Sequence, residues 1–127
     1  MSDESLAAKT IEGFLDVLGS DAPTPGGGAV AGIAGATGTA LIAMVAALTV
    51  GKKGFEGLDR RMRELIAETD KARAEFLDLA DRDAHAFDGV MAAFKMPKET
   101  NEQKTARSKA IQAGYEQAAA VPMETAR

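Results

Sequence analysis

Apolar residues recur along this chain with the spacing of helices. From Leu58 to Ala93 a repeating interval of four and three residues selects positions that are nearly all apolar. Such a seam predicts one long helix that packs lengthwise against other helices. Met96-Pro97 is expected to end it, because a proline disfavours helical geometry in the residue before it.

Two shorter helices are expected at the ends of the chain. Residues 5–18 carry apolar side chains at helical spacing and stop at Gly19. At the other end, Thr100 and Gln103 fit a capping box. The second of these helices should therefore run from there to about residue 120, where Val121-Pro122 is expected to interrupt it.

The segment 29–50 carries no charge over 22 positions and is the most apolar stretch. Its length would suit a membrane span. Against that interpretation, the segment is mostly Ala, Gly and Thr, and no aromatic residues flank it. We therefore expect a central buried helix, in which Gly32, Gly35 and Gly38 allow neighbouring helices to approach closely.

Composition favours helix, so we expect an all-α fold built as a bundle of long antiparallel helices. With 127 residues, one domain spanning 1–127 is expected. The net charge of −4, with both signs interspersed, offers no broad surface for nucleic acid. There are no cysteines, and the N-terminal MSDESLAAKT lacks the pattern of a signal peptide, so a cytoplasmic protein is expected.

Asp83 interrupts the apolar seam of the long helix. At 100° per residue its side chain shares a face with Phe76, Leu79 and Val90. A carboxylate buried without a partner is costly, so Asp83 should retain a proton, pair with a cation or face a ligand. The alternatives are a structural salt bridge or a seam that opens to water here. Its neighbours Asp81 and Asp88 are expected on the polar face.

The stretch PTPGGG at residues 23–28 precedes the apolar helix. Thr24 could cap that helix and Pro25 suits a first helical turn, while the glycines leave backbone amides uncovered, as in anion sites at helix N-termini. A plain turn is the alternative. The lysines Lys52 and Lys53 in the second loop form a basic doublet that could hold a small anion or simply be solvated.

Other chemistry is less well supported. Residues 26–31 fit a loose dinucleotide-binding pattern, but no strand precedes them. The single histidine, His85, points about 160° away from Asp83 by its helical spacing. We therefore expect His85 at the surface and no metal site.

Two stretches, PTPGGGAVAGIAGATGTALIAMVAALTVGKK and DRDAHAFDGVMAAFKMPKE, resemble the cyclodeaminase/cyclohydrolase family. This family contains the formiminotetrahydrofolate cyclodeaminases and the methenyltetrahydrofolate cyclohydrolases of one-carbon metabolism. The pattern holds at Pro25, Gly26, Gly27, Gly28, Lys52, Asp83, Ala86, Phe87, Pro97 and Lys98. Ala29 stands where the family usually has serine.

The resemblance implies an all-helical homodimer, in which dimerisation completes the helical bundle. It also implies that folate binds in a cleft with the glycine-rich loop and that no cofactor is needed beyond the folate substrate. The implied reaction is hydrolysis of methenyltetrahydrofolate, or ammonia release from the formimino group. Asp83 would be the catalytic residue. The expected substrate-binding residues are Pro25, Gly26, Gly27, Gly28, Lys52 and Lys53.

Family domains continue with further helices beyond the position that matches VPMETAR, so the chain resembles the N-terminal part of such a domain, truncated at its C-terminus. Three hypotheses follow from the sequence. The first is a folate-dependent cyclohydrolase or cyclodeaminase, with the cyclohydrolase preferred because no formiminotransferase domain is present. The second is a helical binding module without turnover, and the third is a small membrane protein that spans with residues 29–50.

Overall fold

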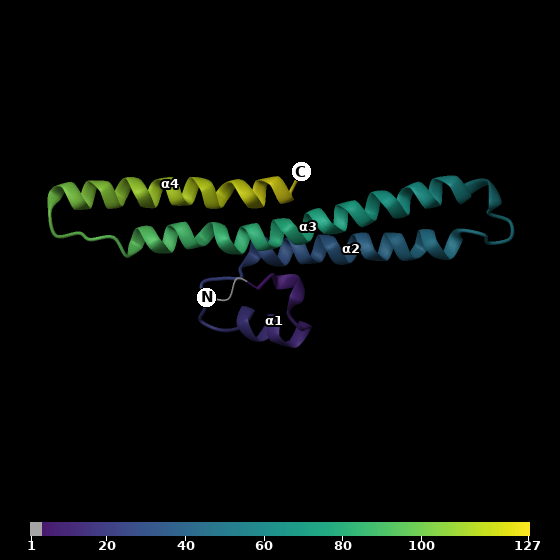
Figure 1. Ribbon diagram of the computed structural model, residues 1–127, viewed down its shortest axis with the longest axis horizontal. Coiled ribbons are helices and arrows are strands. Elements are labelled where there is room, and N and C mark those ends of the chain that lie inside the picture. Colours follow the sequence, from purple (N-terminus) through teal and green to yellow (C-terminus); the bar gives the residue numbers. More distant parts are fainter. Residues whose placement is uncertain (1–3) are drawn as a thin grey trace.

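The computed structural model describes residues 4–127, and throughout that range the regular structure is helical (Figure 1). The elements in chain order are the 3-10 turn η1 (Leu6–Ala8), α1 (Ile11–Leu18), α2 (Gly27–Thr49), the 3-10 turn η2 (Glu56–Leu58), α3 (Asp59–Phe94) and α4 (Asn101–Thr125). The all-α fold predicted from the sequence is therefore confirmed.

Helix α3 is the axis of the molecule. Its 36 residues make it about 54 Å long, at about 1.5 Å per residue. Helix α2 runs antiparallel along the N-terminal part of α3, and α4 runs antiparallel along the C-terminal part (Figure 1). The end of α4 lies near the start of α2, so the middle of α3 is the region covered from both sides.

Glycines bring α2 close to α3. A Cβ placed on Gly32 would lie 2.8 Å from the carbonyl oxygen of Phe76 and 3.0 Å from the Cβ of Ala80. One placed on Gly35 would lie 2.7 Å from the Phe76 ring. The predicted close approach is confirmed at these two positions. Gly38 is different, because a Cβ there would meet nothing within 4 Å.

The core is thin and built mainly of alanine. The buried apolar residues are Ala29, Ala36, Ala46, Ala80, Val90, Ala93 and Val121. A helix over residues 29–50 is confirmed, but its central position is wrong: α3 is central, and only 22% of the most apolar window of α2 is buried. By length and composition α2 could also cross a membrane.

Two helix boundaries differ from those predicted. The segment 5–18 is broken after η1, because the side chain of Thr10 accepts a hydrogen bond from the amide of Gly13 (3.0 Å) and starts α1 afresh. Helix α4 continues through Pro122 to Thr125. The proline lies in the last turn, where its missing amide forfeits one hydrogen bond and its own carbonyl still accepts from Ala126 (3.1 Å).

The other predicted boundaries are confirmed. Helix α3 ends at Phe94, shortly before Met96-Pro97. The capping box at the start of α4 is complete: Thr100 accepts from the amide of Gln103, and the Gln103 side chain accepts from the amide of Thr100.

Candidate functional site

The glycine-rich turn and Asp83 lie in contact where α2 begins beside the middle of α3. A Cβ built on Gly28 would overlap the carboxylate of Asp83. Only a residue without a side chain fits between this carboxylate and the backbone of α2. The two features that the sequence singled out separately therefore form one site.

The N-terminus of α2 presents bare backbone at this site. Gly26 is the N-cap and has no side chain to bind the first amides, and the first helical hydrogen bond runs from the amide of Val30 to Gly26 (3.1 Å). Within residues 4–127 no acceptor takes the amide hydrogens of Gly27, Gly28 or Ala29. Such amides, together with the helix dipole, favour negative charge.

The predicted roles of the residues just before the glycines are wrong. The sequence suggested that Thr24 caps the helix and that Pro25 begins its first turn. Helix α2 instead starts at Gly27, so both residues precede it. The reason is that the backbone of the N-cap, Gly26, is extended (φ −119°, ψ −159°), and the chain turns into the helix only after it.

Asp83 is half-buried and has no protein partner in the part of the chain that is described. No cation of residues 4–127 lies within salt-bridge distance, and no hydrogen bond joins its carboxylate to another residue. The structural salt bridge considered for Asp83 is thus not formed in this range. Its oxygens face solvent and the start of α2, where water or a ligand can bind them.

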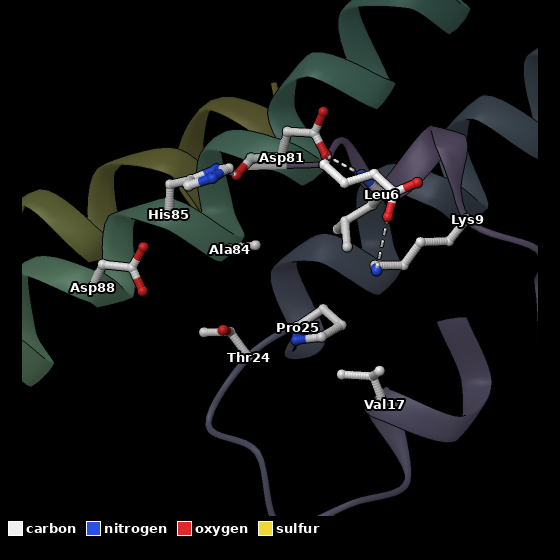
Figure 2. Close-up of a pocket in the computed structure, with 10 residues that line it drawn as sticks. Leu6, Lys9, Val17, Thr24, Pro25, Asp81, Ala84, His85 and Asp88 are labelled. Atoms are coloured by element: carbon white, nitrogen blue, oxygen red, sulfur yellow. Dashed lines mark hydrogen bonds and ion pairs between the residues drawn. The ribbon is translucent and has the colours of Figure 1, made fainter. Parts of the chain in front are cut away.

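A small cavity lies next to this site, on a neighbouring face of α3 (Figure 2). Its volume is about 210 Å³, below the range of about 300–1,000 Å³ usual for small-molecule pockets. Thr24 and Pro25 form one wall, and Asp81, His85 and Asp88 line the opposite side. Asp83 is not among the residues that line this cavity.

Asp81 has a role that the sequence did not predict. Its carboxylate accepts hydrogen bonds from the hydroxyl of Ser5 (2.6 Å) and from the backbone amide of Leu6 (2.7 Å). It therefore ties the N-terminal segment to α3 and closes one side of the cavity (Figure 2). Helical periodicity placed Asp81 on the polar face, whereas the residue is half-buried against the N-terminal segment. Periodicity carries no signal for partners so distant in the sequence.

Lys52 and Lys53 lie far from Asp83 within one chain. They follow the last turn of α2, whose 23 residues separate them from the glycine-rich turn by about 35 Å. Both are exposed, and the Lys52 ammonium lies 5.6 Å from the centre of the Phe55 ring. One chain therefore brings Pro25, the three glycines and Asp83 together, and leaves the lysines at the other end.

His85 is exposed, as expected. Its Nδ1 lies 2.7 Å from the backbone carbonyl oxygen of Asp81, which fixes the orientation of the ring. Within residues 4–127, no group of three or more histidine or acidic side chains is arranged to hold a metal ion.

Comparison with known proteins places these features in a family. A family model described as formiminotransferase-cyclodeaminase matches residues 10–127. A methenyltetrahydrofolate cyclohydrolase from Methylorubrum extorquens is 42% identical over 94% of this chain and 57% of its own length. A formimidoyltransferase-cyclodeaminase from Sus scrofa is 42% identical over 98% of this chain and 23% of its own length.

The fold agrees with a solved structure. The crystal structure of formiminotetrahydrofolate cyclodeaminase from Thermotoga maritima matches with a TM-score of 0.76 and 35% identity, over 93% of this chain and 55% of that one. The present chain is thus an antiparallel helical protein in which a carboxylate, Asp83, contacts the uncapped N-terminus of a helix, α2. The chain belongs to the formiminotransferase-cyclodeaminase family. It spans little more than half the length of the Methylorubrum relative.

Proposed function

We propose that this chain hydrolyses 5,10-methenyltetrahydrofolate to 10-formyltetrahydrofolate. The observation that carries the proposal is the position of Asp83, an unpaired carboxylate against the start of α2. The named activity of the Methylorubrum relative supports it, since that protein matches almost the whole chain.

The chemistry fits a carboxylate without a protein partner. The methenyl bridge carries a positive charge shared between two nitrogens, and Asp83 would stabilise that cation and orient a water molecule toward its carbon. Water adds to the carbon while Asp83 takes one proton from it. The bond from that carbon to N5 then breaks, N5 gains a proton, and the formyl group stays on N10. Overall, the cation and one water give 10-formyltetrahydrofolate and one proton.

Binding and assembly are part of the same proposal. The glycine amides at the start of α2, or Lys52 and Lys53, would hold the anionic glutamate tail of the folate. The substrate carbon is already electrophilic, so the reaction needs no cofactor or metal. We further propose that the protein is a cytoplasmic homodimer without nucleic-acid or membrane partners.

The test follows the ultraviolet chromophore of methenyltetrahydrofolate with the purified chain, a blank without protein and an Asp83→Asn variant. The blank is essential because the compound also hydrolyses spontaneously. We expect the absorbance to fall much faster than in the blank. If Asp83 is a general base, Asp83→Asn should reduce this rate at least about 100-fold. Asp70→Asn, at an exposed position of α3, should keep full turnover. Turnover that survives Asp83→Asn would overturn the assignment.

The alternative is formiminotetrahydrofolate cyclodeaminase activity. The names of the pig relative and of the Thermotoga structure favour it. In that reaction N10 attacks the formimino carbon and ammonia leaves. Asp83 would then accept a proton from N10 and donate one to the departing nitrogen. Ammonia release from 5-formiminotetrahydrofolate measures it directly. Folate binding without either turnover would indicate a silent binding module.

A further inference from the structure

Gly32 is the point at which the backbone of α2 meets the backbone of α3. A Cβ on Gly32 would lie 2.8 Å from the carbonyl oxygen of Phe76 and 3.2 Å from the amide nitrogen of Ala80. Both atoms belong to the interior of α3, and Ala80 is fully buried. For Gly28 and Gly35 the nearest atoms are all side-chain atoms. The contact at Gly32 therefore fixes the distance between the two helices.

This contact lies one helical turn from the site. Gly28 precedes Gly32 by four residues on α2, and Asp83 follows Ala80 by three residues on α3. Because the helices are antiparallel, both steps run in the same direction, by about 6 Å and about 4.5 Å. A change in the spacing at Gly32 is therefore transmitted to the contact between Gly28 and Asp83.

The carboxylate of Asp83 depends on this spacing. Within residues 4–127 it has no hydrogen bond and no cation to hold it, and its contact with Gly28 is one of shape. If the start of α2 moved away from α3, the carboxylate would lose that contact and gain freedom to rotate. The orientation of Asp83 thus rests on the backbone of another helix.

We infer that Gly32 is a positioning residue for Asp83, a role in turnover that rests on the proposed function. The 2.8 Å between a Cβ at position 32 and the Phe76 oxygen is about 0.6 Å shorter than an ordinary contact of 3.4 Å. The backbone of α3 cannot give way without distorting its own helical hydrogen bonds, so α2 would move instead. A displacement of about 1 Å can cost an enzyme about 100-fold in rate.

Gly35 offers a comparison within the same helix. A Cβ there would lie 2.7 Å from the ring of Phe76, which is the end of a side chain. The ring also borders a cavity of about 180 Å³ beside the last turn of α4, together with Leu79 and Thr125. The ring can therefore move aside, and a methyl group at position 35 should displace α2 less than one at position 32.

Turnover of methenyltetrahydrofolate, expressed per folded molecule, tests the inference. Gly32→Ala should lower kcat at least about 10-fold, and Gly35→Ala should lower it much less. Gly114→Ala is the matched control, because a Cβ there meets the backbone of Val90 (3.2 Å) in the contact between α3 and α4. It should keep full turnover. An equal loss of kcat in Gly32→Ala and Gly114→Ala would show that Gly32 contributes only to stability.

The carbon-13 NMR signal of the Asp83 carboxyl group gives a readout that does not depend on activity. The signal is assigned by its disappearance in Asp83→Asn. In Gly32→Ala it should move from its wild-type position, and in Gly114→Ala it should stay. A loss of folded molecules would weaken the signal without moving it. Wild-type kcat together with an unmoved signal in Gly32→Ala would overturn the inference.

A second variant keeps the test decisive if Gly32→Ala does not fold. Ala80→Ser adds one oxygen to the same gap from the side of α3, so the Asp83 signal should move in the same direction by less. An unmoved signal in Ala80→Ser would then refute the role of this contact. If the wild-type chain turns over neither folate, the proposed function fails, and the position of the Asp83 signal alone decides the inference.

Discussion

The carboxylate of Asp83, on α3, rests against Gly28 in the first turn of α2. The contact holds the carboxylate by shape alone, since no protein hydrogen bond or cation within residues 4–127 fixes it. The absence of a side chain at position 28 is therefore as much a part of the site as the carboxylate itself.

The first prediction concerns this contact. Gly28→Ala should displace Asp83 and reduce turnover at least about 10-fold, because the new methyl group and the carboxylate cannot occupy the same space. Because the clash is with the end of a side chain that can rotate away, the loss of stability should be small, about 1 kcal/mol for a less favourable rotamer. Turnover of methenyltetrahydrofolate and urea denaturation measure the two effects.

Gly38→Ala is the matched control in the same helix. A Cβ at Gly38 meets nothing within 4 Å, and alanine favours a helix over glycine by about 1 kcal/mol. This variant should be slightly more stable and fully active. Equal turnover in the Gly28→Ala and Gly38→Ala variants would contradict the role given to the contact.

The second prediction concerns the N-terminal segment. Asp81→Asn should weaken the hydrogen bond from the amide of Leu6, because a neutral side-chain oxygen is a weaker acceptor than a carboxylate. Hydrogen exchange at Leu6 should accelerate about 10-fold. Asp88→Asn, on the same side of the cavity but without a bond to this segment, should leave the exchange rate unchanged. Unchanged exchange in both variants would show that Asp81 does not hold the segment.

The third prediction concerns pH. Arg82 donates to both carboxylate oxygens of Glu124 (3.1 and 2.7 Å) and holds the pKa of Glu124 below its ordinary value. A carboxyl whose pKa is lower in the folded state stabilises the protein above its unfolded pKa, about 4.3, and loses that contribution as the pH falls through the folded value.

Glu124→Gln should therefore have a lower free energy of unfolding than the wild type at neutral pH. This gap in stability should close as the pH falls into the acid range. The effect should be small, because both side chains are about half exposed and solvent screens the pair. Urea midpoints at neutral and acid pH measure the gap. A gap that widens as the pH falls would have the wrong sign.

The fourth prediction concerns the contact between α3 and α4. A Cβ on Gly114 would lie 3.2 Å from the Cα and Cγ2 of Val90, which is fully buried. Gly114→Ala should crowd Val90, and Val90→Ala alone should cost roughly 2 kcal/mol through lost burial. In the double variant the crowding is partly relieved, so the combined loss should fall short of the sum by at least about 0.5 kcal/mol. Strict additivity would show that the two residues are independent.

The local features of the fold were predictable from the sequence. The periodicity from Leu58 to Ala93 predicts α3, and the Thr100 capping box predicts the start of α4. Each of these signals depends only on residues that are close to one another in the sequence. The position of α2 was not predictable. Its apolar residues surround the helix on all sides, so periodicity could not indicate which side faces α3.

The site was predictable in its parts but not in its arrangement. Asp83 could be singled out because it places a charge on an apolar seam. The glycines could be singled out because three in succession directly precede an apolar helix. Their contact depends on how α2 and α3 align, which the sequence pattern does not determine. Asp81 was missed because a carboxylate on a polar face obeys every local rule and acquires its role only through Ser5 and Leu6.

The division of α3 between two partners has a consequence for how the molecule unfolds. Helices α2 and α4 each pack mainly against α3, so the chain consists of two helical hairpins that share α3. Most contacts between helices therefore join helices that are consecutive in the chain. Such a topology has low contact order and allows each hairpin to form and dissolve separately. A ligand at the junction stabilises only the state in which the hairpin that carries Gly28 and Asp83 is intact. Occupancy of the site would thus set the order in which the two hairpins melt.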